Sequence, residues 1–131
     1  MATSCLVSAL ALAQPAQANP TGGTVVSGSA SIIAQNAQST LVQQNSQKAV
    51  ITWQSLNLAA GQNLTFLQPN SSAIALNRVL SNSASVINGT LSANGQVWVI
   101  NPNGVVFGQG ASVNVAGLLA TTSNIADADF L

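Results

Sequence analysis

The chain has 131 residues and is apolar but almost uncharged: 47% of its residues are hydrophobic, 3% are charged, and the net charge is zero. This apolar content argues against intrinsic disorder and predicts a folded domain or part of one. Because Lys and Arg supply the electrostatic part of nucleic-acid affinity, two such residues in the whole chain argue against DNA or RNA as a partner. The polar surface must come from the amides and hydroxyls of Asn, Gln and Ser.

The sequence lacks most of the residue types that acid–base catalysis and metal binding need. The sequence has no His, Tyr or Glu, and its two acidic residues, Asp127 and Asp129, lie near the C-terminal end. General acids and bases must lie within hydrogen-bond reach of one another, so we expect no enzyme, no cofactor and no metal site. The Asp127-Ala128-Asp129 spacing resembles a calcium loop but lacks the Gly and Glu that complete one, which favours a solvated corner.

Residues 1–18 are typical of the later part of a secretory signal peptide. An apolar run from Cys5 to Ala13 is followed by Ala16-Gln17-Ala18, an A-x-A cleavage site before Asn19. The first four residues lack the expected positive charge. A buried N-terminal helix is the weaker alternative, because the run is short, and it is too short to span a membrane. Cleavage would remove the single cysteine and leave residues 19–131 as the mature domain.

Residues 19–131 alternate between short runs of strand-forming residues and turns. Residues 19–31 predict a turn and then a strand that caps the domain, and residues 32–47 are polar and alternating. Further strands are predicted at residues 49–53, 56–58, 64–67, 72–76, 85–91, 96–100, 105–107, 112–115 and 118–121. Nearly every connection contains Asn, Gly, Pro or Ser and is too short for a crossover helix.

Strands this brief favour winding in one direction into a stacked parallel β-helix, with a β-sandwich as the structural alternative. In a β-helix the large aliphatic side chains and Phe point inward. Trp53 and Trp98 are then expected as core plugs or cap covers rather than as ligand platforms. Five Asn residues are expected at inward corners, where their amides would satisfy turn backbone: Asn57, Asn77, Asn88, Asn101 and Asn114.

Residues 86–122 carry the most specific pattern of the chain. Here β-branched runs alternate with Asn-Gly pairs that tolerate positive φ. The ordered blocks are ITWQSLNL (51–58), FLQP (66–69), ALNRV (75–79), ANGQV (93–97), INPNGV (100–105), FG (107–108), VNV (113–115) and GLLATT (117–122). In this order they resemble the amino-terminal secretion domain of two-partner-secretion exoproteins, the filamentous-haemagglutinin-type adhesins.

This resemblance implies an all-β, right-handed parallel β-helix and a role in export. In the family, an outer-membrane two-partner-secretion transporter engages the domain and threads the exoprotein outward, so the product is expected in the medium or at the cell surface, reached through the periplasm and outer membrane. The family domain is longer than this chain, so a domain truncated at its C-terminus is expected. An open coil edge there is predicted to promote self-association.

The segment Asn101-Pro102-Asn103-Gly104 resembles the family's secretion motif. Pro102 fixes φ, and Asn103-Gly104 tolerates the left-handed region, which predicts a rigid corner. The corner either contacts the transporter or nucleates the first coils. Nucleation is favoured, because transporter recognition needs an extended chain with a backbone that can pair. Asn77 and Arg78 are candidates for a partner contact or a structural anchor, and anchoring is favoured for Arg78 because it must find hydrogen-bond partners.

A surface-binding module that acts independently of a transporter is the alternative function. Faces rich in Asn, Gln and Ser suit hydrogen bonding to host or cell-surface glycans, although aromatic platforms are scarce. An enzymatic β-helix is less favoured still, since such enzymes need clustered carboxylates. Transporter dependence would support the secretion domain, and glycan binding by the isolated domain would support the alternative.

Overall fold

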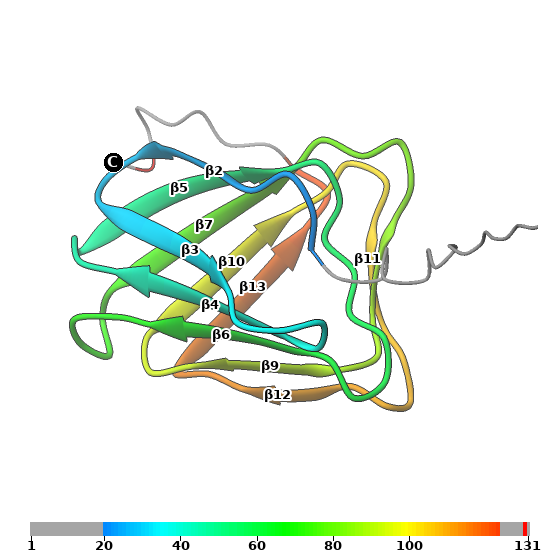
Figure 1. Ribbon diagram of the computed structural model, residues 1–131. Helices are drawn as coiled ribbons and strands as arrows, with labels where there is room; N and C mark the ends of the chain where they lie inside the picture. The colour runs from blue at the N-terminus through cyan, green and yellow to red at the C-terminus, as the bar shows by residue number, and fades with distance from the viewer. Residues whose placement is uncertain (1–19, 124–129, 131) are drawn as a thin grey trace, which may run out of the picture.

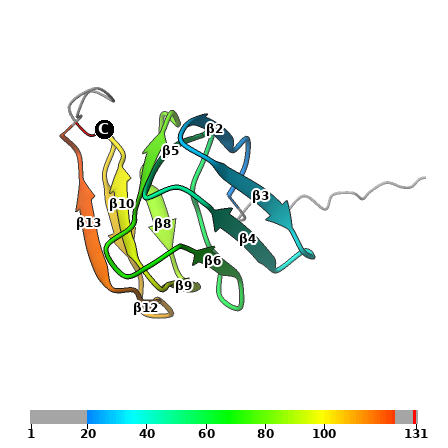
Figure 2. The ribbon, with the colours of Figure 1, turned by 90° about the vertical axis from the view of Figure 1, so that its left-hand side faces the viewer.

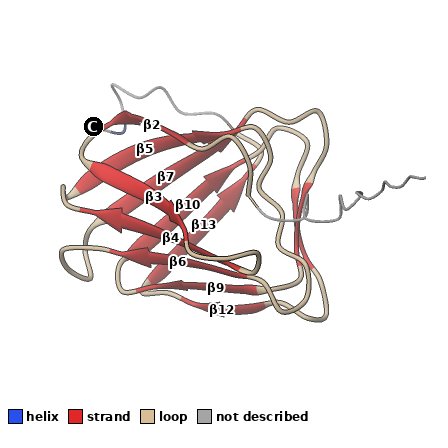
Figure 3. Cartoon of the chain, in the orientation of Figure 1, coloured by secondary structure: helices blue, strands red, loops and turns tan. Residues whose placement is uncertain are grey.

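A computed structural model describes residues 20–123 and Phe130, and every regular element within residues 20–123 is a strand (Figures 1 and 3). The strands are β2 (Thr24–Ser27), β3 (Ala30–Ala34), β4 (Ser39–Gln44), β5 (Lys48–Trp53), β6 (Asn63–Leu67), β7 (Ile74–Val79), β8 (Ser85–Ile87), β9 (Thr90–Ala93), β10 (Gln96–Ile100), β11 (Val105–Phe107), β12 (Ser112–Asn114) and β13 (Gly117–Thr121). None of the described residues forms a helix long and apolar enough to cross a membrane.

Strands from successive coils stack in parallel and form three sheets. Two large sheets have the orders β13-β10-β7-β5-β2 and β12-β9-β6-β4-β3, and β11 pairs with β8 in a third, small sheet (Figures 1 and 2). The pairs β4–β6, β6–β9 and β9–β12 are all parallel, as are β5–β7, β7–β10 and β10–β13. The predicted parallel β-helix is confirmed, and the β-sandwich alternative is wrong.

Three predicted strands differ from those observed. The run at residues 56–58 forms no strand and joins the third side of the helix only through the bridge between Leu58 and Ile87. The run at residues 85–91 is two strands, β8 and β9, because Asn88-Gly89 turns the chain between them. Strand β7 begins at Ile74 rather than at residue 72, since the preceding serines lie in a turn.

Two N-terminal strands close the first coil, where a single capping strand was predicted for residues 19–31, and the second of them, β3, runs on to Ala34. Unlike the stacked coils, β2 pairs antiparallel with β5, and β3 pairs antiparallel with β4. The turn between them includes Gly28, whose φ is +82° and whose position would place a Cβ atom 2.3 Å from the carbonyl oxygen of Lys48. Val25 and Ile32 pack from these strands against the core. The two strands therefore cover the lumen of the helix at this end.

The lumen holds one continuous apolar core. Residues that alternate along the strands fill it, among them Val42, Ile51, Phe66 and Val97, each at most 1% exposed. Trp53 is also 1% exposed within this cluster, so its prediction as a core plug is confirmed.

The predicted position of Trp98 is wrong. It pairs in register with Leu76, and both side chains belong to a second cluster on the outer face of the β5–β7–β10–β13 sheet. The alternation along β10 places Val97 and Val99 in the lumen core and therefore turns Trp98 outward. The expectation that large apolar side chains point inward fails for this sheet, which is apolar on both faces.

Candidate functional site

The segment Asn101–Gly104 forms the corner between β10 and β11. The backbone N–H of Gly104 donates to the carbonyl oxygen of Asn101 at 2.9 Å, which closes the turn, and Gly104 has a φ of +105°. The N–H of Asn101 donates to Thr121 of the next coil, and the N–H of Ser85 in the previous coil donates to Gly104. The corner is thus fixed by backbone bonds to the coils on both sides.

The side chain of Asn101 is fully buried and holds the inside of this corner. Its Nδ2 donates to Ser85 Oγ at 2.9 Å and to the Ser83 carbonyl oxygen at 3.1 Å. Its Oδ1 accepts from the N–H of Asn103 at 2.9 Å. With both donors and the acceptor engaged, this buried amide pairs with the buried hydroxyl of Ser85 and with two backbone groups of the turn.

The outer side of the corner is exposed. Pro102 and Asn103 both face solvent, and Asn103 Nδ2 donates to the Ser81 carbonyl oxygen at 2.8 Å. The motif therefore presents a structural side chain inward and two residues outward. Only the outward pair is accessible to a partner of the folded chain.

Asn77 and Arg78 lie on opposite faces of β7. Asn77 is fully buried and accepts a 2.9 Å hydrogen bond from Trp53 Nε1 of the first coil, while its Nδ2 donates to the backbone oxygens of Ala75 and Trp98 at 3.2 Å. This amide links three coils. Arg78 is half-buried on the outer face, in register with Ile100, the residue that directly precedes the corner.

The other Asn residues do not form one inward ladder. Asn57 and Asn88 are half-exposed, and Asn57 Oδ1 accepts from the Val86 N–H at 2.9 Å. Asn114 is exposed on the outer face of β12, in register with Ser92, so its predicted inward position is wrong.

Buried amides that the sequence analysis missed lie at a different corner. Gln44 and Gln68 are 3% and 6% exposed, and Gln68 Nε2 donates to Gln44 Oε1 at 3.2 Å. Gln68 Oε1 also accepts from the Gly95 N–H at 2.8 Å, which extends the network to the third coil. The available signal was alternation, because each Gln lies two residues beyond a lumen residue, Val42 or Phe66.

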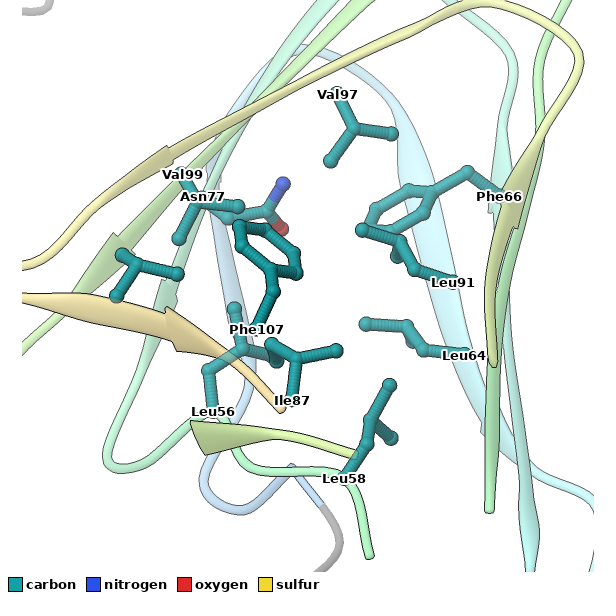
Figure 4. Close-up of a pocket in the computed structure, with 11 residues that line it drawn as sticks. Leu56, Leu58, Leu64, Phe66, Asn77, Ile87, Leu91, Val97, Val99 and Phe107 are labelled. Atoms are coloured by element: carbon teal, nitrogen blue, oxygen red, sulfur yellow. The ribbon is translucent and has the colours of Figure 1, made fainter. Parts of the chain in front are cut away.

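The lumen is a packed core rather than a ligand pocket. Ten apolar side chains and Asn77 line the remaining space, with Phe107 pointing into it (Figure 4). Its water-accessible volume is about 10 Å³, close to what a single water molecule requires. The described residues contain no group of three His, Cys, Asp or Glu side chains placed to hold a metal. The predicted signal segment and the Asp127–Asp129 pair lie outside the described residues.

Similarity to known proteins shows the family to which this β-helix belongs. Residues 16–131 match the family model described as the TPS secretion domain. The chain belongs to the TPS secretion domain family. Its TPS fold is similar to the crystal structure of the HMW1 secretion domain from Haemophilus influenzae, with a TM-score of 0.79, 34% identity and coverage of 85% of this chain and 29% of that one.

Two curated relatives are similar in sequence to most of this TPS domain. Both are heme/hemopexin-binding proteins of Haemophilus influenzae, one 46% identical over 100 residues and the other, from strain ATCC 51907 / DSM 11121 / KW20 / Rd, 41% identical over 106 residues. The matches cover 76% and 81% of this chain but 11% and 12% of the relatives. The family is a secretion domain of exported exoproteins and not an enzyme family. Haemagglutinin or adhesin activity stays a prediction.

Proposed function

We propose that this TPS secretion domain directs an exported protein to an outer-membrane transporter partner, which engages it as an extended chain. The family match over residues 16–131 carries the proposal. Before the coils form, the backbone of an extended chain is unpaired and can pair by strand addition, the mode by which a receptor can hold an unfolded segment. Residues 1–18 are proposed as the signal peptide that brings residues 19–131 to the periplasm.

We further propose that the Asn101–Gly104 corner acts by nucleating coils outside the cell. The burial of Asn101 and its bonds to Ser83, Ser85 and Asn103 support a role within the fold. These bonds exist only in the folded coil, so their loss is expected to weaken folding, whereas a transporter that engages an extended chain could contact Asn101 before it is buried. Asn77 is proposed as a structural anchor for the same reason.

Export of the chain tests the targeting role. The segment, given a complete signal peptide and fused to a reporter, is expressed with and without an outer-membrane two-partner-secretion transporter. Transporter-dependent appearance in the medium is expected. Release that is equal in cells lacking the transporter would contradict the proposal and favour an autonomous surface module.

Asn101→Ala and Asn103→Ala separate nucleation from contact, because the same residue type is buried at one position and exposed at the other. Asn101→Ala removes the partner of the buried Ser85 hydroxyl and of two turn backbone groups, with an expected loss of roughly 1–3 kcal/mol in unfolding free energy and reduced export. Asn103→Ala is expected to change both far less. An Asn101→Ala protein as stable as the parent that is still not exported would reject nucleation and favour direct contact.

The relatives are named for binding heme and hemopexin, but residues 20–131 of this chain lack the side chains that a haem site commonly uses. The side chains that commonly hold haem iron, namely His, Cys, Met and Tyr, are all missing from residues 20–131. We therefore propose no haem site within this TPS domain. The glycan-binding alternative gains no support from the relatives.

A further inference from the structure

The outer face of the β5–β7–β10–β13 sheet carries an apolar column separate from the lumen core. In-register pairing places Val50, Leu76, Trp98 and Leu119 side by side on four successive coils. Ile100 belongs to the same outer cluster. Although these side chains point away from the lumen, Val50 and Leu76 are 0% exposed. Another part of the chain must therefore cover them.

Phe130 covers this column. Phe130 is 5% exposed and clusters with Val50, Leu76 and Ile100. The ring meets Trp98 in an edge-on geometry, with 5.5 Å between centroids and an interplanar angle of 62°. Aromatic pairs favour this arrangement over a stacked sandwich. Phe130 is therefore held by packing against these apolar side chains and by the edge-on contact with Trp98.

Lys48 contacts both the ring and the backbone of Phe130. Its Nζ lies 5.5 Å from the ring centroid and donates a 2.9 Å hydrogen bond to the Phe130 carbonyl oxygen. The ammonium group thereby combines a cation–π contact with a charge-assisted hydrogen bond. Lys48 begins β5 on the first coil, whereas Phe130 follows β13 of the fourth coil. The contact joins the two ends of the stack.

We propose that Lys48, Val50, Leu76, Trp98 and Ile100 form an intramolecular latch site whose occupant is Phe130. In a solenoid each coil contacts only its neighbours. This site takes residues from β5, β7 and β10, so it is complete only when three successive coils are stacked in register. With Phe130 in this site, a residue that follows β13 in the chain contacts the first, second and third coils. The proposal rests on contacts within the fold and is independent of the role in export.

Fluorescence of the full chain tests the latch, because Phe130 touches Trp98 and Trp53 lies in the lumen. Phe130→Ala is expected to shift emission to longer wavelength and to increase acrylamide quenching. The same substitution in a Trp98→Phe background is expected to change neither. Leu80→Ala, which truncates a 59% exposed leucine outside the site, is the control and is expected to match the parent.

Thermal unfolding gives the second measurement. Phe130→Ala is expected to lower the Tm by roughly 10 °C, as for truncation of a buried Phe. Phe130→Leu and Lys48→Met are expected to give smaller losses, since each retains apolar bulk but removes the ring or the amine. Unchanged Trp98 emission in Phe130→Ala would overturn the latch, even with a lower Tm. If that variant does not fold, unchanged Trp98 emission in both Phe130→Leu and Lys48→Met would overturn it.

Discussion

The two ends of the lumen have similar inward-facing residues but opposite exposure. At the N-terminal end, Ile51 and Trp53 of the first coil are 0% and 1% exposed. At the other end, Phe107, Val113 and Leu118 are 38%, 39% and 40% exposed, although each pairs in register with a residue that is at most 3% exposed. The inward position alone does not bury a side chain.

The difference comes from what lies beyond each coil. The antiparallel strands β2 and β3 cover the first coil, and they bring Val25 and Ile32 onto its core. Within the described residues, β11, β12 and β13 form the last strand of each sheet and pair on one side only. Burial in a solenoid is therefore supplied by the next coil, and the outermost coil needs a cap or a partner to obtain it.

Truncation of one lumen residue at each end should give the largest contrast. Trp53→Ala is expected to cost about 4 kcal/mol of unfolding free energy, because it opens a cavity and removes the donor to Asn77 Oδ1. Leu118→Ala, at the exposed end, is expected to cost less than about 1.5 kcal/mol. Urea unfolding of both variants measures the contrast. Equal losses would mean that the covered end is no better packed than the open one.

The buried Gln network should give the next largest effect. Gln68→Leu is expected to cost roughly 2–3 kcal/mol, since it leaves Gln44 Oε1 and the Gly95 N–H without their partner in a site that excludes water. Gln43→Leu is the matched control, because Gln43 is exposed and adjoins Gln44. Urea midpoints give both values. A loss for Gln68→Leu no greater than that of the control would indicate that water replaces the network.

Much of the fold could be predicted because its signals are local. Short β-branched runs and Asn-Gly turns indicate where most strands begin and end. The ordered motif blocks carry the family resemblance, which implied a parallel β-helix. The capping strand near Val25 was also predicted. The turn at Asn101–Gly104 followed from the fixed φ of Pro102 and from the tolerance of Gly104 for positive φ, which is +105° here.

The rest depended on contacts between coils. Trp98 was predicted to be a core plug or a cap cover because large aromatics dominate cores, but its face is set by register with Leu76, and its cover comes from Phe130, many residues away. Asn114 was predicted inward by residue type, whereas alternation in β12 places it outward. The type of a residue indicates its polarity, but strand pairing and register determine whether its side chain lies on the inner or the outer face of the sheet.

The turn of the N-terminal cap can be tested with two glycines of similar conformation. Gly28 and Gly61 have φ values of +82° and +84°, yet an added Cβ atom at Gly28 would meet the Lys48 carbonyl oxygen at 2.3 Å and at Gly61 would meet nothing within 4 Å. Gly61→Ala is expected to cost about 1 kcal/mol from backbone strain alone. Gly28→Ala is expected to cost roughly 1–3 kcal/mol more, because strand β5 must shift. Similar Tm values for the two variants would show that the cap adapts freely.

The open end should affect association more than stability. Among the strands that the structure describes, β12 and β13 have no partner on their outer edges, and together with half-exposed lumen residues these edges offer a second copy of the chain both backbone and apolar contacts. We expect the parent to self-associate in size-exclusion chromatography and Val113→Lys to shift the population toward monomer, with stability changing by less than about 1 kcal/mol. Leu67→Lys is the control, since Leu67 is 51% exposed on β6, an inner strand of the same sheet. A sharp monomer peak for the parent would reject edge association. Equal dissociation by both lysines would assign the effect to charge, whereas dissociation by Val113→Lys alone would locate the contact at the end of the helix formed by β11, β12 and β13.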